Sequence, residues 1–399
     1  MDLTISPGNL GGELQIIPSK SQAHRLLICA AFADALTELI CPETNRDIEA
    51  TAACLSALGA AVRRTPTGYS VTPCACIPES ACLRCGESGS TLRFLLPIVG
   101  ALGVSAVFQL EGRLPQRPLS PLWEEMERMG CQLQFISDHE LLCQGQLRSG
   151  DYTINGSVSS QFITGLLFAA ALMKGDSVIH ITGTLESKPY VDMTLQAMAQ
   201  FGICVTNLHV SGGRQFHSPG QLTVEGDWSN GAFWLAAEAL GNPIRVSGLA
   251  ADSAQGDRAV TEILHQLETG CPTICARDIP DLVPILAVAA GAKHGAVFTQ
   301  IERLRLKESD RVAATVAMLR NLGGKAEATA DTLTVYGTGY AGGTVDACND
   351  HRIAMATAIA ATVCTQPVTI LGAECVQKSY PSFWAEYKRL GGQYEQHLR

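Results

Sequence analysis

The stretch LSALGAAV, Leu55 to Val62, joins the end of a helix pattern to the start of a strand pattern through a single glycine. A glycine after a bulky apolar residue suits a helix end, where the backbone turns left-handed and a side chain is unfavourable. The same motif recurs as MERMGCQL, MAQFGICV, LRNLGGKA and YKRLGGQY. The turns are therefore expected at Gly59, Gly130, Gly202, Gly323 and Gly391. This recurrence predicts a fold built from repeated helix-and-strand units.

The spacing of the repeats predicts how many units the chain holds. The first three glycines, and also the last two, are about seventy residues apart, whereas the gap from Gly202 to Gly323 is nearly double. A sixth, abbreviated copy is expected in LHQLETGCPTI, Leu264 to Ile274. Six units of strand and helix fit two α/β domains of three units each, with a break near 225–228, where the strand-like QLTVEG precedes the helical SNGAFWLAAEALG.

The composition is that of a well-packed globular protein. Hydrophobic residues make up 46% of the 399 residues and charged residues 17%, and the net charge is -9. A broad basic face for nucleic acid or a membrane surface is therefore not expected. The longest apolar runs fall short of the roughly 18 residues that a membrane span needs. The start, MDLTISPGNL, has neither a basic segment nor an apolar signal core, so we expect a cytoplasmic protein without a removed leader.

Four of the fifteen cysteines, Cys74, Cys76, Cys82 and Cys85, crowd into one short segment. Zinc binding is one interpretation, but the spacing is not that of the tight zinc repeats and no histidine is adjacent. If Leu83 to Cys85 is a strand, Cys82 and Cys85 point to opposite faces. Reduced thiols are the favoured interpretation.

Several long apolar helices are expected to open with a small polar residue. The sequence places N-caps at Ser21, Ser90, Ser160 and Asp350. Helix starts of this kind also bind anions, because unpaired amides and the positive end of the helix dipole point outward.

Basic residues lie beside these helix starts, although the protein is acidic overall. Each alone is interpreted most simply as a solvated surface charge. Together, on repeated Gly- and Ser-rich turns from both halves of the chain, they predict a shared site for phosphate and carboxylate groups, which arginine binds bidentately. The set is Lys20, Arg25, Arg93, Arg117, Lys188, Lys307, Arg311, Arg352 and Lys378.

Two acids stand out among these cations. Asp281, in DIPDLVPILAVAA, can be a helix cap, and Glu308, in LKESDR, can be a first-turn helix acid. The alternative is that they form a general acid/base pair, which takes up and returns protons while the cations hold the substrates.

The motifs, in order, resemble those of the 5-enolpyruvylshikimate-3-phosphate synthases. They are PSKSQAHR, GESGSTLR, RPLSPL, GSVSSQFITGLL, ESKPYVDMTL, QGDR, DIPDLVPILAVAA, LRLKESDR, NDHRIAM and QKSYPSFW, and they span about 18–384. The resemblance implies the two-domain inside-out α/β fold of the enolpyruvyl transferases, with six βαβαββ-type repeats, the fourth shortened. It places one domain at 1–18 plus 228–399 and the other at 19–227.

The resemblance also implies the activity of a 3-phosphoshikimate 1-carboxyvinyltransferase. The enolpyruvyl group of phosphoenolpyruvate would pass to the 5-hydroxyl of shikimate 3-phosphate, releasing phosphate, in the shikimate pathway to chorismate and the aromatic amino acids. No metal or organic cofactor is implied, and the two small molecules are the only partners expected of a monomer that binds neither nucleic acid nor membrane.

Carried over motif by motif, the resemblance assigns the site residues. Asp281 would accept the proton of the 5-hydroxyl and Glu308 would donate and relay a proton, together with Lys20. Shikimate 3-phosphate would be bound by Lys20, Ser21, Arg25, Ser159, Ser160, Gln161, Ser187, Asp281 and Lys307, with help from Lys188 and Tyr190. Phosphoenolpyruvate would be bound by Lys20, Gly89, Arg117, Gln161, Arg311, Arg352 and Lys378. Since both domains supply contacts, we expect substrate to close the protein around itself.

The chain departs from the family pattern in three places. Glu87 stands where the family usually has asparagine, which puts a negative charge beside a phosphoenolpyruvate loop. The segment 256–281 is short, so the fourth repeat is expected to lack a strand pair. Arg303 occupies a position that is asparagine in part of the family, and it is assigned no role.

Three alternatives are weighed against this assignment. The enolpyruvyl transferases that act on UDP-N-acetylglucosamine share the fold but carry a cysteine where this chain has Gly112. A catalytically dead homologue would not need Asp281, Glu308, Lys20 and Lys378 together. RNA-end cyclases share related repeats, but they need a nucleotide-binding histidine and a basic face that are not seen in this sequence.

Overall fold

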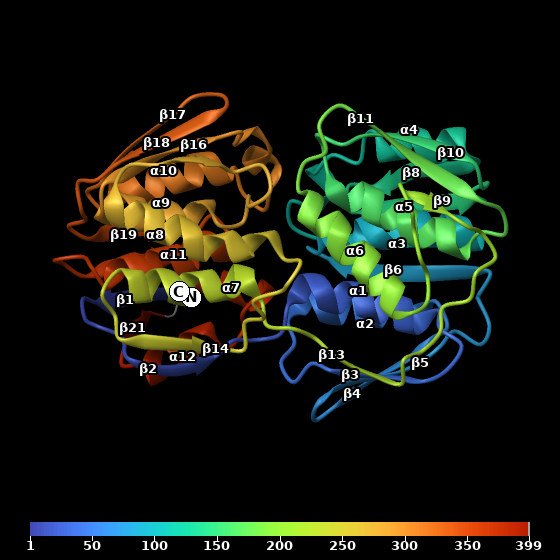
Figure 1. Cartoon of the computed structure of the whole chain (residues 1–399), viewed down its shortest axis with the longest axis horizontal. Coiled ribbons are helices and arrows are strands. Elements are labelled where there is room, and N and C mark those ends of the chain that lie inside the picture. Colours follow the sequence, from blue (N-terminus) through green and yellow to red (C-terminus); the bar gives the residue numbers. More distant parts are fainter. Residues whose placement is uncertain (398–399) are drawn as a thin grey trace. The chain divides into compact units, whose positions relative to one another are not determined.

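The computed structural model describes residues 1–397 and divides the chain into two compact units (Figure 1). Unit 1 comprises Met1–Ile17 and the chain from Gly226 onward, and unit 2 comprises Pro18–Glu225. Each unit has its own hydrophobic core. No helix within residues 1–397 is both long enough and apolar enough to cross a membrane.

One four-stranded sheet of unit 2 shows the repeat in full. Its first two strands run parallel and are joined through a helix, and an antiparallel hairpin completes the strand order β6-β7-β9-β8. Along the chain this gives the order strand, helix, strand, helix, strand, strand. The elements are β6 (Ser80–Gly86), α3 (Gly89–Leu102), β7 (Ser105–Leu110), η1 (Leu114–Gln116), α4 (Leu122–Arg128), β8 (Cys131–Ser137) and β9 (Glu140–Gly145).

The other two sheets of unit 2 follow the same plan. The sheet β13-β3-β5-β4 again joins one parallel pair to two antiparallel pairs, and β10-β11-β12 has one strand fewer. Their elements are α1 (Lys20–Ala31), β3 (Thr37–Ile40), α2 (Arg46–Ala57), β4 (Ala61–Thr65), β5 (Gly68–Thr72), β10 (Asp151–Asn155), α5 (Ser160–Leu172), β11 (Ser177–Thr182), α6 (Lys188–Gln200), β12 (His209–Val210) and β13 (Gln221–Thr223).

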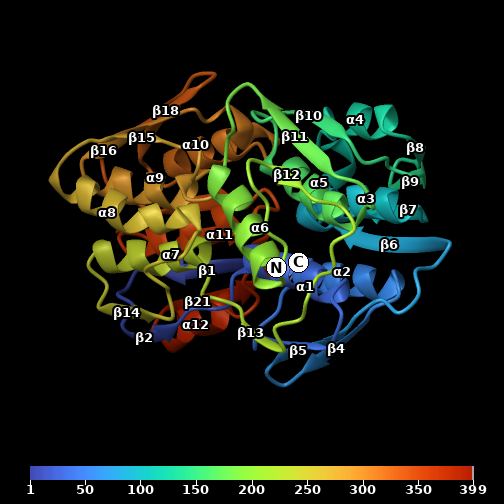
Figure 2. The same ribbon diagram turned by 45° about the vertical axis from the view of Figure 1, so that its right-hand side comes forward.

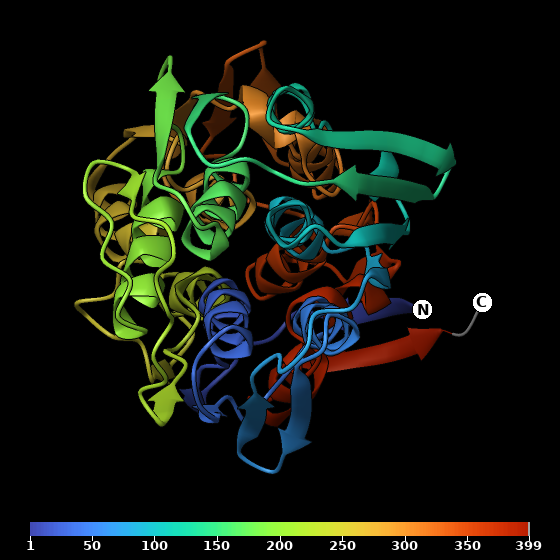
Figure 3. The ribbon, with the colours of Figure 1, turned by 90° about the vertical axis from the view of Figure 1, so that its right-hand side faces the viewer.

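Unit 1 repeats this topology in the sheets β15-β16-β18-β17 and β19-β20-β1-β21. In the second of these the N-terminal strand pairs with the last described strand, β21, as Figure 3 shows near the N label. The elements are β1 (Asp2–Ser6), β15 (Thr273–Cys275), α9 (Val283–Ala292), β16 (Gly295–Thr299), η3 (Glu302–Leu306), α10 (Arg311–Asn321), β17 (Lys325–Ala328), β18 (Thr332–Tyr336), β19 (Gly343–Asp346), α11 (His351–Ala361), β20 (Val368–Leu371), η4 (Ala373–Lys378), α12 (Phe383–Arg389) and β21 (Gln393–His397).

The fourth repeat is abbreviated, as the sequence predicts. Its sheet contains only β2 and β14, paired in parallel, without the antiparallel strands found in the other repeats. Gly270, the turn glycine of this copy, is extended at φ -179°, whereas the five full turn glycines all have positive φ. The elements are β2 (Gly12–Gln15), α7 (Trp228–Ala239), β14 (Ile244–Ser247), η2 (Gly256–Ala259) and α8 (Val260–Thr269).

Within each unit the most apolar helices lie inside and the sheets lie outside, which confirms the predicted fold class (Figures 1 and 2). Every residue of α11 is buried, as are nearly all residues of α3, α5 and α9. A helix that is apolar on all sides is stable only when other parts of the protein surround it and exclude water. The starts of these central helices carry several of the expected site residues: Gly89, Ser159, Ser160, Gln161, Asp281 and Arg352.

The helices begin slightly earlier than the sequence predicts. Ser19, Ser88 and Ser159 are the N-caps of α1, α3 and α5, so the predicted caps at Ser21, Ser90 and Ser160 are wrong by one or two residues. Two serines lie within two residues of each other at each of these helix starts, and either could supply a capping hydroxyl. The predicted cap Asp350 is confirmed, because its side chain accepts a hydrogen bond from the backbone nitrogen of Arg352 at 3.0 Å.

Candidate active site

The start of α1 presents Lys20 as its first helical residue. Its ammonium donates to Asp47, the second residue of α2, at 2.9 Å. The two side chains are only 16% and 17% exposed, so water screens the pair far less than it would at an open surface. Ser21, the next residue of α1, is half-buried, and its carbonyl accepts a hydrogen bond from Arg25 at 2.6 Å.

Arg25 is enclosed within unit 2. Its guanidinium donates to the Thr194 hydroxyl and to the Tyr190 carbonyl, both at 2.8 Å, and it lies over the ring of Phe94. Burial lowers the pKa of Arg25 to about 10, so the group remains a cation at neutral pH. The residue thus ties α1 to α6.

Gln161, in the first turn of α5, connects two helix starts. Its amide oxygen accepts from Arg93 of α3 at 2.9 Å, and its amide nitrogen donates to the Ser90 hydroxyl at 3.0 Å. Gly89 opens α3 directly against two guanidinium groups: a Cβ at this position would lie 2.9 Å from Nη1 of Arg117 and 3.0 Å from Nη1 of Arg93. We call Gly89, Ser90, Arg93, Arg117 and Gln161 the amide cluster. The structure brings together three of the expected residues here, Gly89, Arg117 and Gln161.

The remaining expected residues of unit 2 lie at helix starts. Ser159 caps α5, and Ser160 is its buried first residue. Ser187 precedes α6 with a left-handed backbone, φ 55°, which is strained for serine. Lys188 is exposed and forms an ion pair with Asp192 one turn further along α6.

In unit 1 the loops before α9, α10 and α11 bring acids and cations together. Asp281 accepts from Arg311 at 2.7 Å through one oxygen and from Arg352 at 3.0 Å through the other. Lys307 lies 3.7 Å from Asp281, and Glu308 accepts from Arg311 at 2.7 Å. With Asp350 these form the acid–arginine cluster, which contains five of the expected residues: Asp281, Lys307, Glu308, Arg311 and Arg352.

Asp350 fixes the guanidinium of Arg311 and caps the helix whose second residue is Arg352. Its side chain is fully buried, caps α11 and accepts from Nε of Arg311 at 3.0 Å and from the Ser309 hydroxyl at 2.9 Å. Arg311 is 1% exposed and Arg352 is 4% exposed. A buried guanidinium needs acceptors for its fork of N–H groups, and the carboxylates supply them.

Burial and the charges of the cluster shift the pKa values of Asp281, of Lys307 and of the neighbouring Asp257. Burial would raise the pKa of Asp281, but Arg352, Lys307 and Arg311 together hold that pKa well below its usual value. Burial lowers the pKa of Lys307 to about 8, although Asp281 counteracts the effect. Burial and the negative charge of Asp281 raise the pKa of Asp257 to about 7. Ionisable groups that lie close together and whose pKa values are strongly shifted are typical of acid/base sites.

Lys378 ends η4 in unit 1 and is 7% exposed. Its ammonium donates to the Asn349 carbonyl at 2.9 Å. Cys348 and Asn349 are both left-handed, at φ 52° and 54°, and they lead directly into Asp350 and α11. Lys378 is thereby attached to the loop that carries Asp350 of the acid–arginine cluster.

Glu87 packs against Gly112 in unit 2. A Cβ at Gly112 would lie 2.5 Å from Oε2 of Glu87, and the glycine is left-handed at φ 56°. A side chain at position 112 would therefore be strained in its backbone and would have to displace the carboxylate.

Sequence patterns indicate only part of these clusters. Arg93 is recognisable as a cation beside a helix start, and its position four residues after Gly89 places both on one helix face. Asp350 is recognisable as a helix cap, but no local sequence pattern indicates that it also holds Arg311. Asp47 gave no signal beyond that of an acid in a first helical turn.

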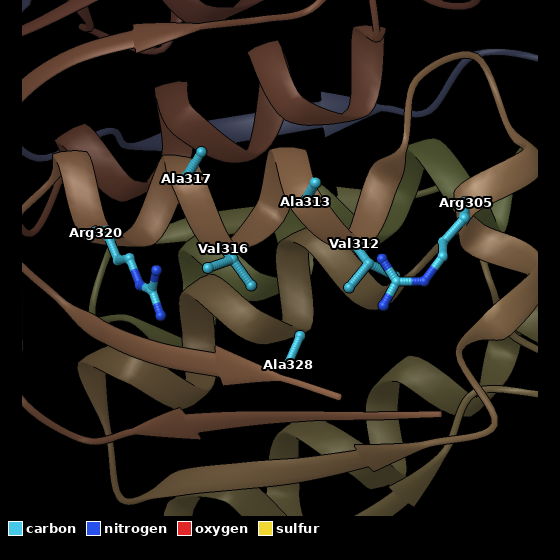
Figure 4. A pocket seen from close by; sticks show the side chains of 7 residues that line it. All are labelled: Arg305, Val312, Ala313, Val316, Ala317, Arg320 and Ala328. Carbon is cyan, nitrogen blue, oxygen red and sulfur yellow. The ribbon is translucent and has the colours of Figure 1, made fainter. Parts of the chain in front are cut away.

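Other features of the described chain lie apart from these clusters. Within residues 1–397, no three His, Cys, Asp or Glu side chains are placed to hold a metal ion. Cys82 is exposed and Cys85 is buried, as expected for alternate faces of β6. A shallow pocket of about 380 Å³ on α10 contains none of the expected site residues (Figure 4). Its lining is Arg305, Val312, Ala313, Val316, Ala317, Arg320 and Ala328.

The chain is similar to known proteins over nearly its whole length. The chain matches the family described as EPSP synthase (3-phosphoshikimate 1-carboxyvinyltransferase) over residues 5–274 and 272–387. It is 38% identical over 418 residues to the 3-phosphoshikimate 1-carboxyvinyltransferase of Clostridium kluyveri, covering 99% of this chain and 98% of that protein. The corresponding protein of Clostridium acetobutylicum is 38% identical over 414 residues, covering 97% of both chains. The EPSP synthase structure from Acinetobacter baumannii shares the fold, with a TM-score of 0.82, 22% identity and full coverage of both chains. The chain therefore belongs to the EPSP synthase (3-phosphoshikimate 1-carboxyvinyltransferase) family.

Proposed function

We propose that the chain transfers the enolpyruvyl group of phosphoenolpyruvate to the 5-hydroxyl of shikimate 3-phosphate with the residues named above in the following roles. The reaction has two halves. The hydroxyl oxygen first attacks C2 of phosphoenolpyruvate, while the hydroxyl loses its proton and C3 gains one. The resulting tetrahedral intermediate then expels phosphate as C3 returns a proton.

The acid–arginine cluster is the observation that carries this proposal. Asp281 faces the substrate hydroxyl in this assignment and takes its proton, and Lys307 binds the sugar beside it. Arg311 and Arg352 present fixed guanidinium groups to the carboxylate of phosphoenolpyruvate. Because Asp350 already holds Arg311, little reorganisation is needed when charge develops in the reaction.

Glu308 is assigned as the proton donor to C3 and as the group that later receives the proton. It lies beside Arg311, so a ligand bound to that arginine would also lie beside the Glu308 carboxyl. Lys20 and Lys378 would place positive charge around the phosphate of phosphoenolpyruvate, where the leaving group gains negative charge. Lys20 would also relay protons.

In unit 2 we assign the shikimate phosphate to the start of α5. Ser159, Ser160 and Ser187 offer hydroxyls, and the first-turn amides of α5 add the positive end of the helix. Ser21 and Arg25 would bind the shikimate carboxylate. Gln161 would touch both ligands, and Gly89 with Arg117 would complete the contacts to phosphoenolpyruvate. Both units thus contribute to substrate binding, and we propose that they act as two domains, 1–18 plus 228–399 and 19–227.

The packing of Glu87 against Gly112 supports the shikimate assignment over UDP-N-acetylglucosamine. The enolpyruvyl transferases that act on UDP-N-acetylglucosamine carry a cysteine at the position of Gly112. Here a side chain at position 112 would clash with Glu87 and would need a left-handed backbone.

We further propose that the protein works as a cytoplasmic monomer that binds neither nucleic acid nor membrane. All fifteen cysteines are free thiols, which suits a reducing compartment. The net charge of -9 disfavours polyanionic partners. The large hydrophobic side chains that residues 1–397 expose are Leu36, Phe135, Ile136 and Leu306, which make no broad apolar interface. Analytical ultracentrifugation would test the monomer.

The decisive assay follows phosphate release by the purified protein from phosphoenolpyruvate. We expect release with shikimate 3-phosphate as acceptor and none with UDP-N-acetylglucosamine. Release only with the sugar nucleotide, or with neither acceptor, would overturn the assignment.

A further inference from the structure

Helix α2 carries none of the residues assigned to the substrates, yet its buried side is lined with polar groups. Asp47 and Thr51 are four residues apart and therefore lie on one face, one turn after the other. Thr51 is fully buried and Asp47 is largely buried. Polar side chains in such a position need partners, and the partners belong to the two helices on which substrate residues are expected.

The first set of partners lies on α1. Lys20 and His24 are also four residues apart, and they pair with α2 in register: Lys20 with Asp47 at 2.9 Å and His24 with Thr51 at 2.8 Å. Burial, followed by the charges of Lys20 and Arg25, lowers the pKa of His24 well below its usual value, so the imidazole is neutral. The two contacts fix both the rotation of α2 about its axis and its position along that axis relative to α1.

The second set of partners lies on α3. The Thr51 hydroxyl is 2.7 Å from that of Thr91, and Oγ1 of Thr91 also lies 3.4 Å from the Asp47 carbonyl oxygen and 2.7 Å from the Ser88 hydroxyl. Ser88 caps α3, immediately before Gly89 of the amide cluster. The first turn of α2 is thus linked to the starts of both α1 and α3.

We propose that Asp47 is a positioning residue for the transfer reaction: it holds the ammonium of Lys20 at the place where that group acts on the substrates. The lysine side chain has four rotatable bonds, and a fixed carboxylate removes much of that freedom before substrate arrives. Asp47 itself is fixed because its backbone belongs to a capped helix that is pinned on both sides. The proposal rests on the role assigned to Lys20 above.

The test compares three variants of the full-length protein in steady-state kinetics. For Asp47→Asn, which keeps the shape but removes the charge, we expect kcat to fall roughly 10- to 100-fold while KM for each substrate changes less than about threefold. Asp47→Glu keeps the charge and should recover part of the loss. Glu49→Gln is the matched control, because Glu49 is an exposed acid in the same helical turn, and it should leave kcat unchanged.

A double-mutant cycle separates positioning of Lys20 from a general structural effect. In a Lys20→Ala background, Asp47→Asn should cost less than about twofold more in kcat, because the side chain that it positions is gone. The proposal would be overturned if the losses in kcat of the two single variants were fully additive in the double variant. It would also be overturned if Asp47→Asn, with an unchanged melting temperature, kept the wild-type kcat. A wild-type protein without activity would instead overturn the assigned reaction, so the two failures can be told apart.

Discussion

Asp281 accepts a hydrogen bond of 2.7 Å from Nη1 of Arg311, so the assigned proton acceptor and an assigned phosphoenolpyruvate ligand hold each other directly. The carboxylate of phosphoenolpyruvate would compete with Asp281 for the same N–H groups. If the substrate carboxylate engaged Arg311, the positive charge that depresses the pKa of Asp281 would be shared, and Asp281 would become a stronger base. Binding of one substrate would thereby prepare the acceptor for the proton of the other.

The Asp281→Asn variant tests the proton acceptor. We expect kcat to fall by about 10²–10⁴-fold, because an amide cannot take the hydroxyl proton. Calorimetry should show shikimate 3-phosphate affinity within a few-fold of wild type, since the serine and lysine contacts remain. Asp252→Asn, an exposed acid of the same unit, is the control and should behave as wild type. Unchanged turnover in Asp281→Asn would remove Asp281 from its role.

The pH dependence of activity tests Lys307. Its pKa is lowered to about 8, so the ammonium is present below that pH and is lost as the pH rises through it. We expect kcat/KM for shikimate 3-phosphate to decline on the alkaline side with an apparent pKa near 8.

Lys307→Arg should remove this decline up to pH 10, because a guanidinium stays charged throughout that range. Lys325→Arg, at an exposed lysine of β17, should leave the profile as in wild type. An identical decline in Lys307→Arg would show that another group titrates.

Asp257 makes the stability of unit 1 depend on pH. Its pKa is raised from 3.8 to about 7, so the unfolded chain loses this proton at lower pH than the folded protein does. The contribution of this group to stability is therefore complete below about pH 4 and is lost as the pH rises toward 7.

Asp257→Asn keeps a neutral group that can accept from Ser229. Relative to wild type, the variant should gain roughly 2–4 kcal/mol of unfolding free energy between pH 4 and pH 8. Chemical denaturation at both pH values measures the difference. If the difference in unfolding free energy between the variant and wild type were the same at both pH values, the raised pKa of Asp257 would be contradicted.

Glu87 is expected to weaken phosphoenolpyruvate binding, because its negative charge stands beside the loop that contains Gly89. In Glu87→Asn we expect KM for phosphoenolpyruvate to fall by about two- to tenfold, with KM for shikimate 3-phosphate unchanged. The control is Glu79→Gln, at an exposed acid just before the other end of β6. A higher KM for phosphoenolpyruvate in Glu87→Asn would show that the carboxylate supports binding instead.

The repeated motif was sufficient to predict two α/β domains of three units each, whereas the inside-out arrangement of helices and sheets was implied only by the resemblance to a known family. A helix end, a left-handed glycine and a strand start are local events within a few residues, and the five full copies follow the same rule at Gly59 through Gly391. The shortened fourth repeat could also be predicted, because missing residues cannot form strands. The exact helix starts could not, since neighbouring serines offer nearly equal caps.

The sequence was sufficient to predict which charged residues belong to the candidate site, but not which acid contacts which cation. Sequence alone indicated Asp281, Arg311 and Arg352 together with the function that such groups serve. It gave no sign that Asp350 fixes Arg311 or that Asp47 holds Lys20, because an acid in a first helical turn is ordinarily a solvated cap.

The sequence by itself determined the repeated architecture and the residue types of the site, since both follow from short-range patterns of apolar and polar side chains. Only the tertiary structure decided which acid meets which cation. Asp281 lies 30 residues from Arg311 and 71 from Arg352 along the chain. The packing of α9, α10 and α11 brings them into contact, and the burial that results sets their pKa values.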